Sequence, residues 1–149
     1  MPQDMNPDQV KNLLKFIDKT QSEAVKQSVF TQLGHDCFYT RKLNEWIGQY
    51  VGDVQALLDW VNVEKGSKYW ERLAFNADRS VLTLTGKVVE ECACAFADCA
   101  DPPLSLCHHC CQHFQQKIFG MLLGQPVEVT ITEAFLLGDD RCSTIIRIV

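Results

Sequence analysis

The first third of the chain has the hydrophobic spacing of amphipathic helices. After Asn6, apolar residues recur at positions i, i+3, i+4 and i+7 over residues 10–17, which is the apolar stripe of a helix. Asn6 is a suitable N-cap, and Pro7 suits the first turn because the N–H that proline lacks would have no partner there. Further segments with this spacing begin near Ser22, Leu43 and Asp53. The sequence therefore predicts a helical region over residues 1–63.

The pattern changes to that of strands after residue 66. Two runs rich in β-branched and aromatic residues, Tyr69–Phe75 and Val81–Val88, flank a turn segment over residues 76–79. Runs of this kind on either side of a turn predict a β-hairpin. Alternate residues of the second run are apolar, so one face of this hairpin is expected to face a core.

A long helix and a second hairpin complete the predicted fold. Ser105 is a suitable N-cap for a helix over Leu106–Leu123, and Gly124 is a natural C-cap. Residues 127–132 alternate between apolar and polar, and residues 142–149 form a second strand after a turn. Helices and hairpins without strict β-α alternation predict an α+β fold with an antiparallel four-stranded sheet.

The chain length favours one domain over residues 1–149, in which the helical region over residues 1–63 is followed by hairpin, cysteine-rich loop, helix and hairpin over residues 64–149.

Net charge is −5, and the 14 basic residues form no stripe, so nucleic-acid binding is not expected. No stretch approaches the roughly 20 apolar residues of a membrane span. The polar residues 1–10 lack the features of a signal peptide, which predicts a cytoplasmic protein whose eight cysteines are thiols or metal ligands.

Six of the eight cysteines fall within residues 92–111. Cys92 and Cys94 form a C-x-C pair in an extended stretch, where residues i and i+2 point to the same side. Cys107 and Cys110 form a C-x-x-C pair in the first turn of the expected helix, where residues i and i+3 are neighbours and the helix dipole stabilises thiolates. Two sulfur donors from each segment make a tetrahedral set that suits Zn²⁺. We therefore predict a zinc site in this region.

The spacing leaves the fourth ligand open. His108 could replace Cys107 as a ligand, and Cys99 on the intervening loop is a further donor. Cys111 and Cys142 suit the role of small apolar thiols packed in a core. The C-x-x-C pair also fits a redox dithiol, in which the first thiolate attacks, although the sequence has no βαβ unit of the kind that usually carries this motif.

Several short motifs occur in an order typical of one known family. They are the segment Glu91–Cys94, Cys110 in a helix that ends at Gly124, residues 124–129, and Gly138–Cys142 before a terminal strand. With these motifs, the C-terminal half resembles the 4-vinyl reductase (hydrocarbon-binding) domain and its bacterial relatives, which include L-2-amino-thiazoline-4-carboxylic acid hydrolase-like proteins. Residues 33–37 also resemble an N-terminal element of the hydrolase-like relatives.

The resemblance implies the ligand-binding fold shared with nitric-oxide signalling and Golgi-transport proteins. In that fold, helices pack against an antiparallel sheet, often around a pocket for an apolar small molecule, and homodimers are common. Four aromatic residues of the helical region are candidates to line such a pocket or to form ordinary core: Phe16, Phe30, Trp46 and Trp60.

The hydrolase-like relatives imply an alternative function. A zinc-bound water could open a thiazoline ring if the ion kept an open position, and His109 could then act as acid. The candidates for the base are three carboxylates, each of which is more simply explained as a solvated charge on a loop: Glu90, Glu91 and Asp98. A closed four-thiolate site would instead be structural.

A nucleophilic thiol site is a further option, since His35, Asp36 and Cys37 supply its residue types. Consecutive helical residues point about 100° apart, so these three cannot form a triad among themselves, although Cys37 could approach the main cysteine cluster through the tertiary fold. We therefore expect a zinc-binding domain for a small apolar molecule. A small metal- or thiol-dependent hydrolase, and a redox sensor or metal-handling protein, are the alternatives.

Overall fold

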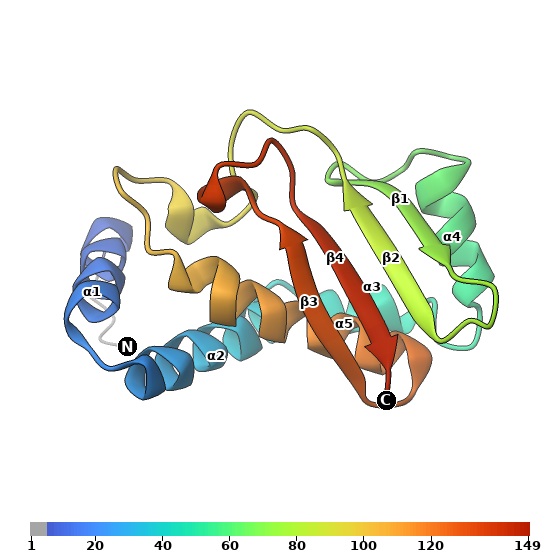
Figure 1. Ribbon diagram of the computed structural model, residues 1–149, viewed down its shortest axis with the longest axis horizontal. Helices are drawn as coiled ribbons and strands as arrows, with labels where there is room; N and C mark the ends of the chain where they lie inside the picture. Colours follow the sequence, from blue (N-terminus) through green and yellow to red (C-terminus); the bar gives the residue numbers. More distant parts are fainter. Residues whose placement is uncertain (1–5) are drawn as a thin grey trace.

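The computed structural model describes residues 6–149, so residues 1–5 of the polar N-terminal segment lie outside it. It consists of helices packed against a four-stranded antiparallel sheet (Figure 1). The elements follow in the order α1 (Pro7–Thr20), α2 (Glu23–Thr40), α3 (Leu43–Gly48), α4 (Val54–Asn62), β1 (Trp70–Phe75), β2 (Val81–Gly86), η1 (Ala95–Ala97), η2 (Leu106–Cys111), α5 (Gln112–Leu123), β3 (Val127–Glu133), η3 (Phe135–Leu137) and β4 (Ser143–Ile148). The predicted α+β class and its four-stranded antiparallel sheet are confirmed.

Local signals placed most helix ends correctly. The Asn6 side chain accepts the Gln9 N–H, and the Gln9 side chain accepts the Asn6 N–H in return, which forms a capping box at the start of α1. Ser22 caps α2 through the Val25 N–H. Gly124 ends α5 with a left-handed backbone, a conformation that glycine adopts without steric cost.

The start of the long helix differs from the prediction. Ser105 has a helical backbone and makes no side-chain cap; its hydroxyl donates instead to the carboxylate of Asp18 at the end of α1. The first six residues, Leu106–Cys111, form the π-helix η2, and the α-helix α5 begins only at Gln112. The prediction of one α-helix over Leu106–Leu123 was therefore wrong in its first six residues.

The sheet has the strand order β1-β2-β4-β3. The C-terminal strand β4 lies between β2 and β3, with Ile146 opposite Leu82 of β2 and Val129 of β3. Strand β2 ends at Gly86, two residues earlier than predicted. Consequently Cys92 and Cys94 lie on an irregular loop rather than on a strand.

Two clusters of buried side chains hold the molecule together. The larger cluster joins the sheet to α3, α4 and α5 and includes Leu73, Leu82 and Phe119. The smaller cluster joins α1 and α2 to η2 and to the loop around η1; Phe30 and Leu106 are central to it. The cysteine-rich loop therefore belongs to the smaller cluster.

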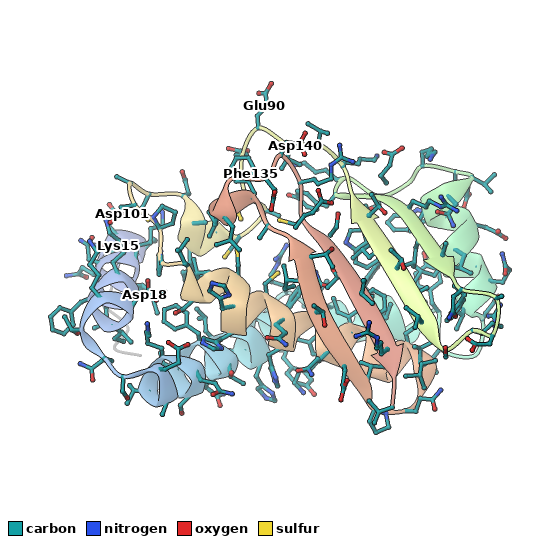
Figure 2. All side chains as sticks on the ribbon, in the orientation of Figure 1. Lys15, Asp18, Glu90, Asp101, Phe135 and Asp140 are labelled. Atoms are coloured by element: carbon teal, nitrogen blue, oxygen red, sulfur yellow. The ribbon has the colours of Figure 1, made fainter. Side chains whose placement is uncertain are left out.

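One face of α1 holds this loop in place. The ammonium groups of Lys11 and Lys15 donate to the carbonyl oxygens of Asp98 and Ala100 at 2.9 and 2.8 Å. One turn further on, Lys19 forms an ion pair of 3.0 Å with Asp101. Figure 2 shows Lys15 and Asp101 near one another on the α1 side of the molecule.

The four aromatic residues named as candidates for a pocket or for ordinary core lie in different parts of the fold. The rings of Trp46 and Trp60 pack edge to face in the larger cluster, with centroids 5.9 Å apart. Phe30 is fully buried in the smaller cluster, and Phe16 is 59% exposed. Within residues 6–149, no helix is both long and apolar enough to cross a membrane.

A candidate thiol centre

Cysteines from distant segments of the chain gather beside η2. All eight lie in the described range and are free thiols. Figure 2 shows sulfur atoms collected where the loop around η1, the start of η2 and the segment before β4 meet. The fold thus joins the predicted region over 92–111 to α2 and to the C-terminal strand.

Two glycines allow the backbones of these segments to approach closely. A Cβ atom at Gly34 of α2 would clash with the carbonyl oxygen of Cys110, and one at Gly86 would clash with the carbonyl oxygen of Cys142. A backbone hydrogen bond of 2.9 Å from Val89 to Asp140 also joins the cysteine-rich loop to the segment before β4. Backbone contact therefore fixes the position of the thiols.

The π-helix determines which cysteines of η2 face the same way. Its wider turn, with i→i+5 hydrogen bonds, brings residues four apart nearly into line and turns residues three apart to different sides. Cys107 and Cys111 therefore share one face of η2, while Cys110 faces α2. The C-x-x-C spacing would bring Cys107 and Cys110 together in an α-helix, whereas the segment is a π-helix; the ligand set expected from the sequence stays a prediction.

Four thiols from three segments form what we call the four-thiol group. Its members are Cys92, Cys107, Cys111 and Cys142. Every pair among them is close enough for the charges of the thiolates to interact. The backbone N–H of Phe135, labelled in Figure 2, also donates to the Sγ of Cys142 at 3.4 Å.

Electrostatics disfavour negative charge in the four-thiol group. Burial, followed by the neighbouring thiols Cys92 and Cys142, raises the pKa of Cys107 to about 12. Burial and the same kind of neighbours also raise the pKa of Cys111 and of Cys142. Without a cation, Cys107, Cys111 and Cys142 are therefore protonated at neutral pH.

A second arrangement joins α2 to η2 through what we call the thiol pair, Cys37 and Cys110. A hydrogen bond between the two side chains lowers the pKa of Cys37 to about 7; burial opposes this shift, and the charge of Arg41 assists it. The same hydrogen bond, together with burial, raises the pKa of Cys110. Cys94 lies near both members of this pair and also near the four-thiol group.

The remaining predicted donors lie elsewhere. His108 is exposed and lines a hollow of about 510 Å³ with Asp18 and Glu23. In the same hollow the Nε2 atom of His109 lies 2.8 Å from a carboxylate oxygen of Glu23. The thiol of Cys99 donates to the nearby carbonyl oxygen of Phe96, at 3.8 Å. His108 and His109 thus face this hollow.

The candidate catalytic carboxylates lie on the surface of the molecule. Glu90, Glu91 and Asp98 are exposed, and Figure 2 shows Glu90 pointing away from the molecule. Asp36 accepts a hydrogen bond of 3.0 Å from Gln32 on the outside of α2. His35 packs beside Tyr39, with ring centroids 5.0 Å apart.

As placed, no three Cys, His, Asp or Glu side chains of residues 6–149 form a ready ligand set for one ion. The thiols are nevertheless near neighbours.

From the sequence, Cys111 and Cys142 were expected to serve in packing, and the place of Cys37 stayed open. One signal could have identified Cys142: it closes the Gly138–Cys142 motif. Nothing local to Cys111 indicates its direction, because that depends on the π-helix.

Comparison with known proteins supports the fold and leaves the family open. No family model matches the chain, and no curated protein matches it. Among solved structures it is similar to the phenol-responsive sensory domain of the transcription activator PoxR with phenol, with a TM-score of 0.52 and 10% identity over 97% of this chain and 75% of that one. It is also similar to a trafficking protein particle complex subunit 3 from Naegleria fowleri covalently bound to palmitic acid, with a TM-score of 0.42 and 13% identity over 97% and 82%. The likeness to the PoxR domain is one of fold alone.

Proposed function

We propose that this protein is a zinc-binding domain for a small apolar molecule, of the 4-vinyl reductase type. One observation supports the metal site above all others. The four-thiol group brings together sulfurs from the cysteine-rich loop, from η2 and from the residue before β4. Packing alone does not require that four thiols from segments so far apart in the sequence lie next to one another.

The chemistry of the donor set fits Zn²⁺. The raised pKa values of Cys107, Cys111 and Cys142 make these thiols costly to ionise, and a divalent cation offsets that cost because it binds thiolates directly. An all-sulfur set of four suits tetrahedral zinc. Since the chain has no disulfides, all four sulfurs are available as ligands.

A structural role for the ion agrees best with these donors. Four thiolates close the coordination shell and leave no position for a water nucleophile. The carboxylates that a hydrolase would need as base, Glu90, Glu91 and Asp98, are exposed. We therefore propose that the ion links the cysteine-rich loop to η2 and β4, and we do not favour hydrolysis.

Metal analysis of purified variants tests this proposal. Protein produced in zinc-supplemented medium is expected to hold about one zinc per chain by mass spectrometry of the metal, as a four-coordinate structural site would. Cys92→Ser and Cys142→Ser are expected to lose the ion. Cys99→Ser is the matched control, because Cys99 is not a member of the four-thiol group and its thiol donates to Phe96, and it is expected to keep the ion.

Cys110→Ser distinguishes the four-thiol group from the ligand set predicted by sequence spacing. It is expected to retain zinc if the four-thiol group binds the ion, and to lose it if Cys92, Cys94, Cys107 and Cys110 do. Wild-type protein without zinc after supplementation would refute the metal site altogether. Retention of full zinc content by Cys142→Ser would refute the four-thiol group.

The ligand-binding half of the proposal is supported by the fold. The PoxR sensory domain, whose structure holds phenol, has the same architecture over 97% of this chain. The motifs over residues 91–94 and 138–142 agree with the 4-vinyl reductase type. Phenol is therefore the first probe for an apolar ligand.

A further inference from the structure

The thiol pair stands apart from the proposed zinc ligands. Cys37 lies one turn after Gly34 on α2, and Gly34 packs directly on the backbone of Cys110. This contact holds the two helices at a fixed separation at the point where the thiols meet. The thiols of Cys37 and Cys110 are therefore close enough to interact, although 73 positions separate them in the sequence.

We propose that Cys37 and Cys110 are a site of reversible oxidation that forms a disulfide when the protein meets a hydroperoxide. Cys37 is the attacking residue, because it is partly exposed whereas Cys110 is only 6% exposed. The lowered pKa of Cys37 agrees with this order. Cys110 is already in contact with Cys37 and is therefore the residue that completes the disulfide.

The chemistry balances with the hydroperoxide as oxidant. The Cys37 thiolate attacks one oxygen of the O–O bond, which breaks; the sulfur becomes a sulfenic acid, and the departing oxygen leaves as hydroxide or alkoxide and takes up a proton. The Cys110 sulfur, losing its proton, then attacks the sulfenic sulfur, and the hydroxyl group leaves as water. The two thiols together give up two electrons to the peroxide. A dithiol reductant returns two electrons and two protons and restores them.

The disulfide differs from the redox dithiol suggested by the C-x-x-C spacing. In the π-helix, Cys107 faces the four-thiol group while Cys110 faces α2, so a bond between Cys107 and Cys110 is not favoured. The oxidised form would instead join α2 to η2 by a covalent bond. Because Cys111 follows Cys110, this bond would also restrain the backbone of the four-thiol group.

Peptide mapping after treatment with hydrogen peroxide tests the proposal. Trypsin releases Cys37 alone in peptide 27–41, and releases Cys110 in peptide 88–117. Oxidised wild-type protein is expected to yield these two peptides as one linked species, which dithiothreitol separates. Cys110→Ser is expected to lose the linked species, and Cys99→Ser and Cys107→Ser are expected to keep it.

Two results would overturn the proposal. One is wild-type protein in which peptide 27–41 stays unlinked under peroxide. The other is a Cys110→Ser variant that forms the link at wild-type yield. If Cys110→Ser fails to fold, fragmentation of the linked wild-type species identifies the partner of Cys37 directly. A partner other than Cys110 would also overturn the proposal.

The proposal does not depend on zinc binding. Metal content is measured in the same samples, so the two proposals fail separately. A linked species in zinc-free protein supports the thiol pair while it counts against the metal site. Zinc-loaded protein without the link supports the metal site alone.

Discussion

At the scale of single residues, the environment divides identical thiols into two chemical kinds. Cys37 receives a hydrogen bond from Cys110 and has a pKa lowered to about 7. Cys107 is buried among other thiols, and burial is the larger cause of a pKa raised to about 12. A thiolate is therefore readily available at Cys37 near neutral pH and unavailable at Cys107 without a cation.

Alkylation of Cys37 is expected to follow this pKa. Only the thiolate reacts with iodoacetamide, so the rate rises with pH and is half-maximal where half of the thiol is ionised. For Cys37 that midpoint is expected at about pH 7, against about 8.5 for an ordinary cysteine. The rate is measured by mass spectrometry of peptide 27–41, which holds no other cysteine.

Cys110→Ser provides the comparison for this prediction. A serine hydroxyl is a different hydrogen-bond partner, so the midpoint for Cys37 is expected to move away from that of the wild type. A wild-type midpoint near 8.5 or higher would show that the hydrogen bond to Cys110 does not stabilise the thiolate.

At the scale of elements, sequence reasoning succeeded where the signal is local and failed where it is tertiary. The capping box at Asn6 and the left-handed Gly124 act within one or two turns, so they could be predicted. The π-helix could not: Ser105 occupies the cap position, but its hydroxyl donates to Asp18 of a distant helix instead of capping η2. The directions of Cys107, Cys110 and Cys111 follow from that change, and so do the two thiol groups.

The contact between α2 and η2 is expected to tolerate no side chain at position 34. Gly34→Ala would place a methyl group against the carbonyl oxygen of Cys110, and overpacking of this kind costs about 1–3 kcal/mol. Gly120→Ala in α5 is the matched control, since its methyl group would lie 3.7 Å from the nearest atom, the carbonyl oxygen of Gln125. There the helix preference for alanine is expected to add about 0.5–1 kcal/mol of stability.

Urea unfolding of the two variants measures this difference. We expect Gly34→Ala to unfold at lower urea concentration than the wild type and Gly120→Ala at higher concentration, with equal slopes. The close approach of α2 to η2 would be disproved if both substitutions stabilised the protein.

At the scale of the whole molecule, the two clusters of buried side chains separate Cys110 and the cysteine-rich loop from the tryptophans. The smaller cluster holds Cys110 and some of the cysteine-rich loop. The larger cluster holds all three tryptophans, Trp46, Trp60 and Trp70, packed beside Phe119. An apolar ligand and a metal ion would therefore occupy different regions of the fold, with helix α5 and η2 continuous between them (Figure 1).

An apolar ligand must displace side chains of the larger cluster to enter it. Trp70 stacks on Phe119 with ring centroids 5.8 Å apart, and Phe119 is fully buried. A ring the size of phenol is expected to insert where these aromatic rings meet, because there it replaces one aromatic contact by another. Binding to the folded state alone raises the melting temperature by mass action.

Phenol is therefore expected to change tryptophan emission and to raise the melting temperature together, with the same midpoint concentration. Phe119→Leu removes the ring beside Trp70 and is expected to move that midpoint several-fold. Phe16→Leu is the control, since Phe16 is 59% exposed and outside the larger cluster, and its midpoint is expected to equal that of the wild type. A melting temperature and an emission spectrum that stay constant up to the solubility limit of phenol would exclude this class of ligand from the larger cluster. An equal shift of the midpoint in both variants would place the binding outside it.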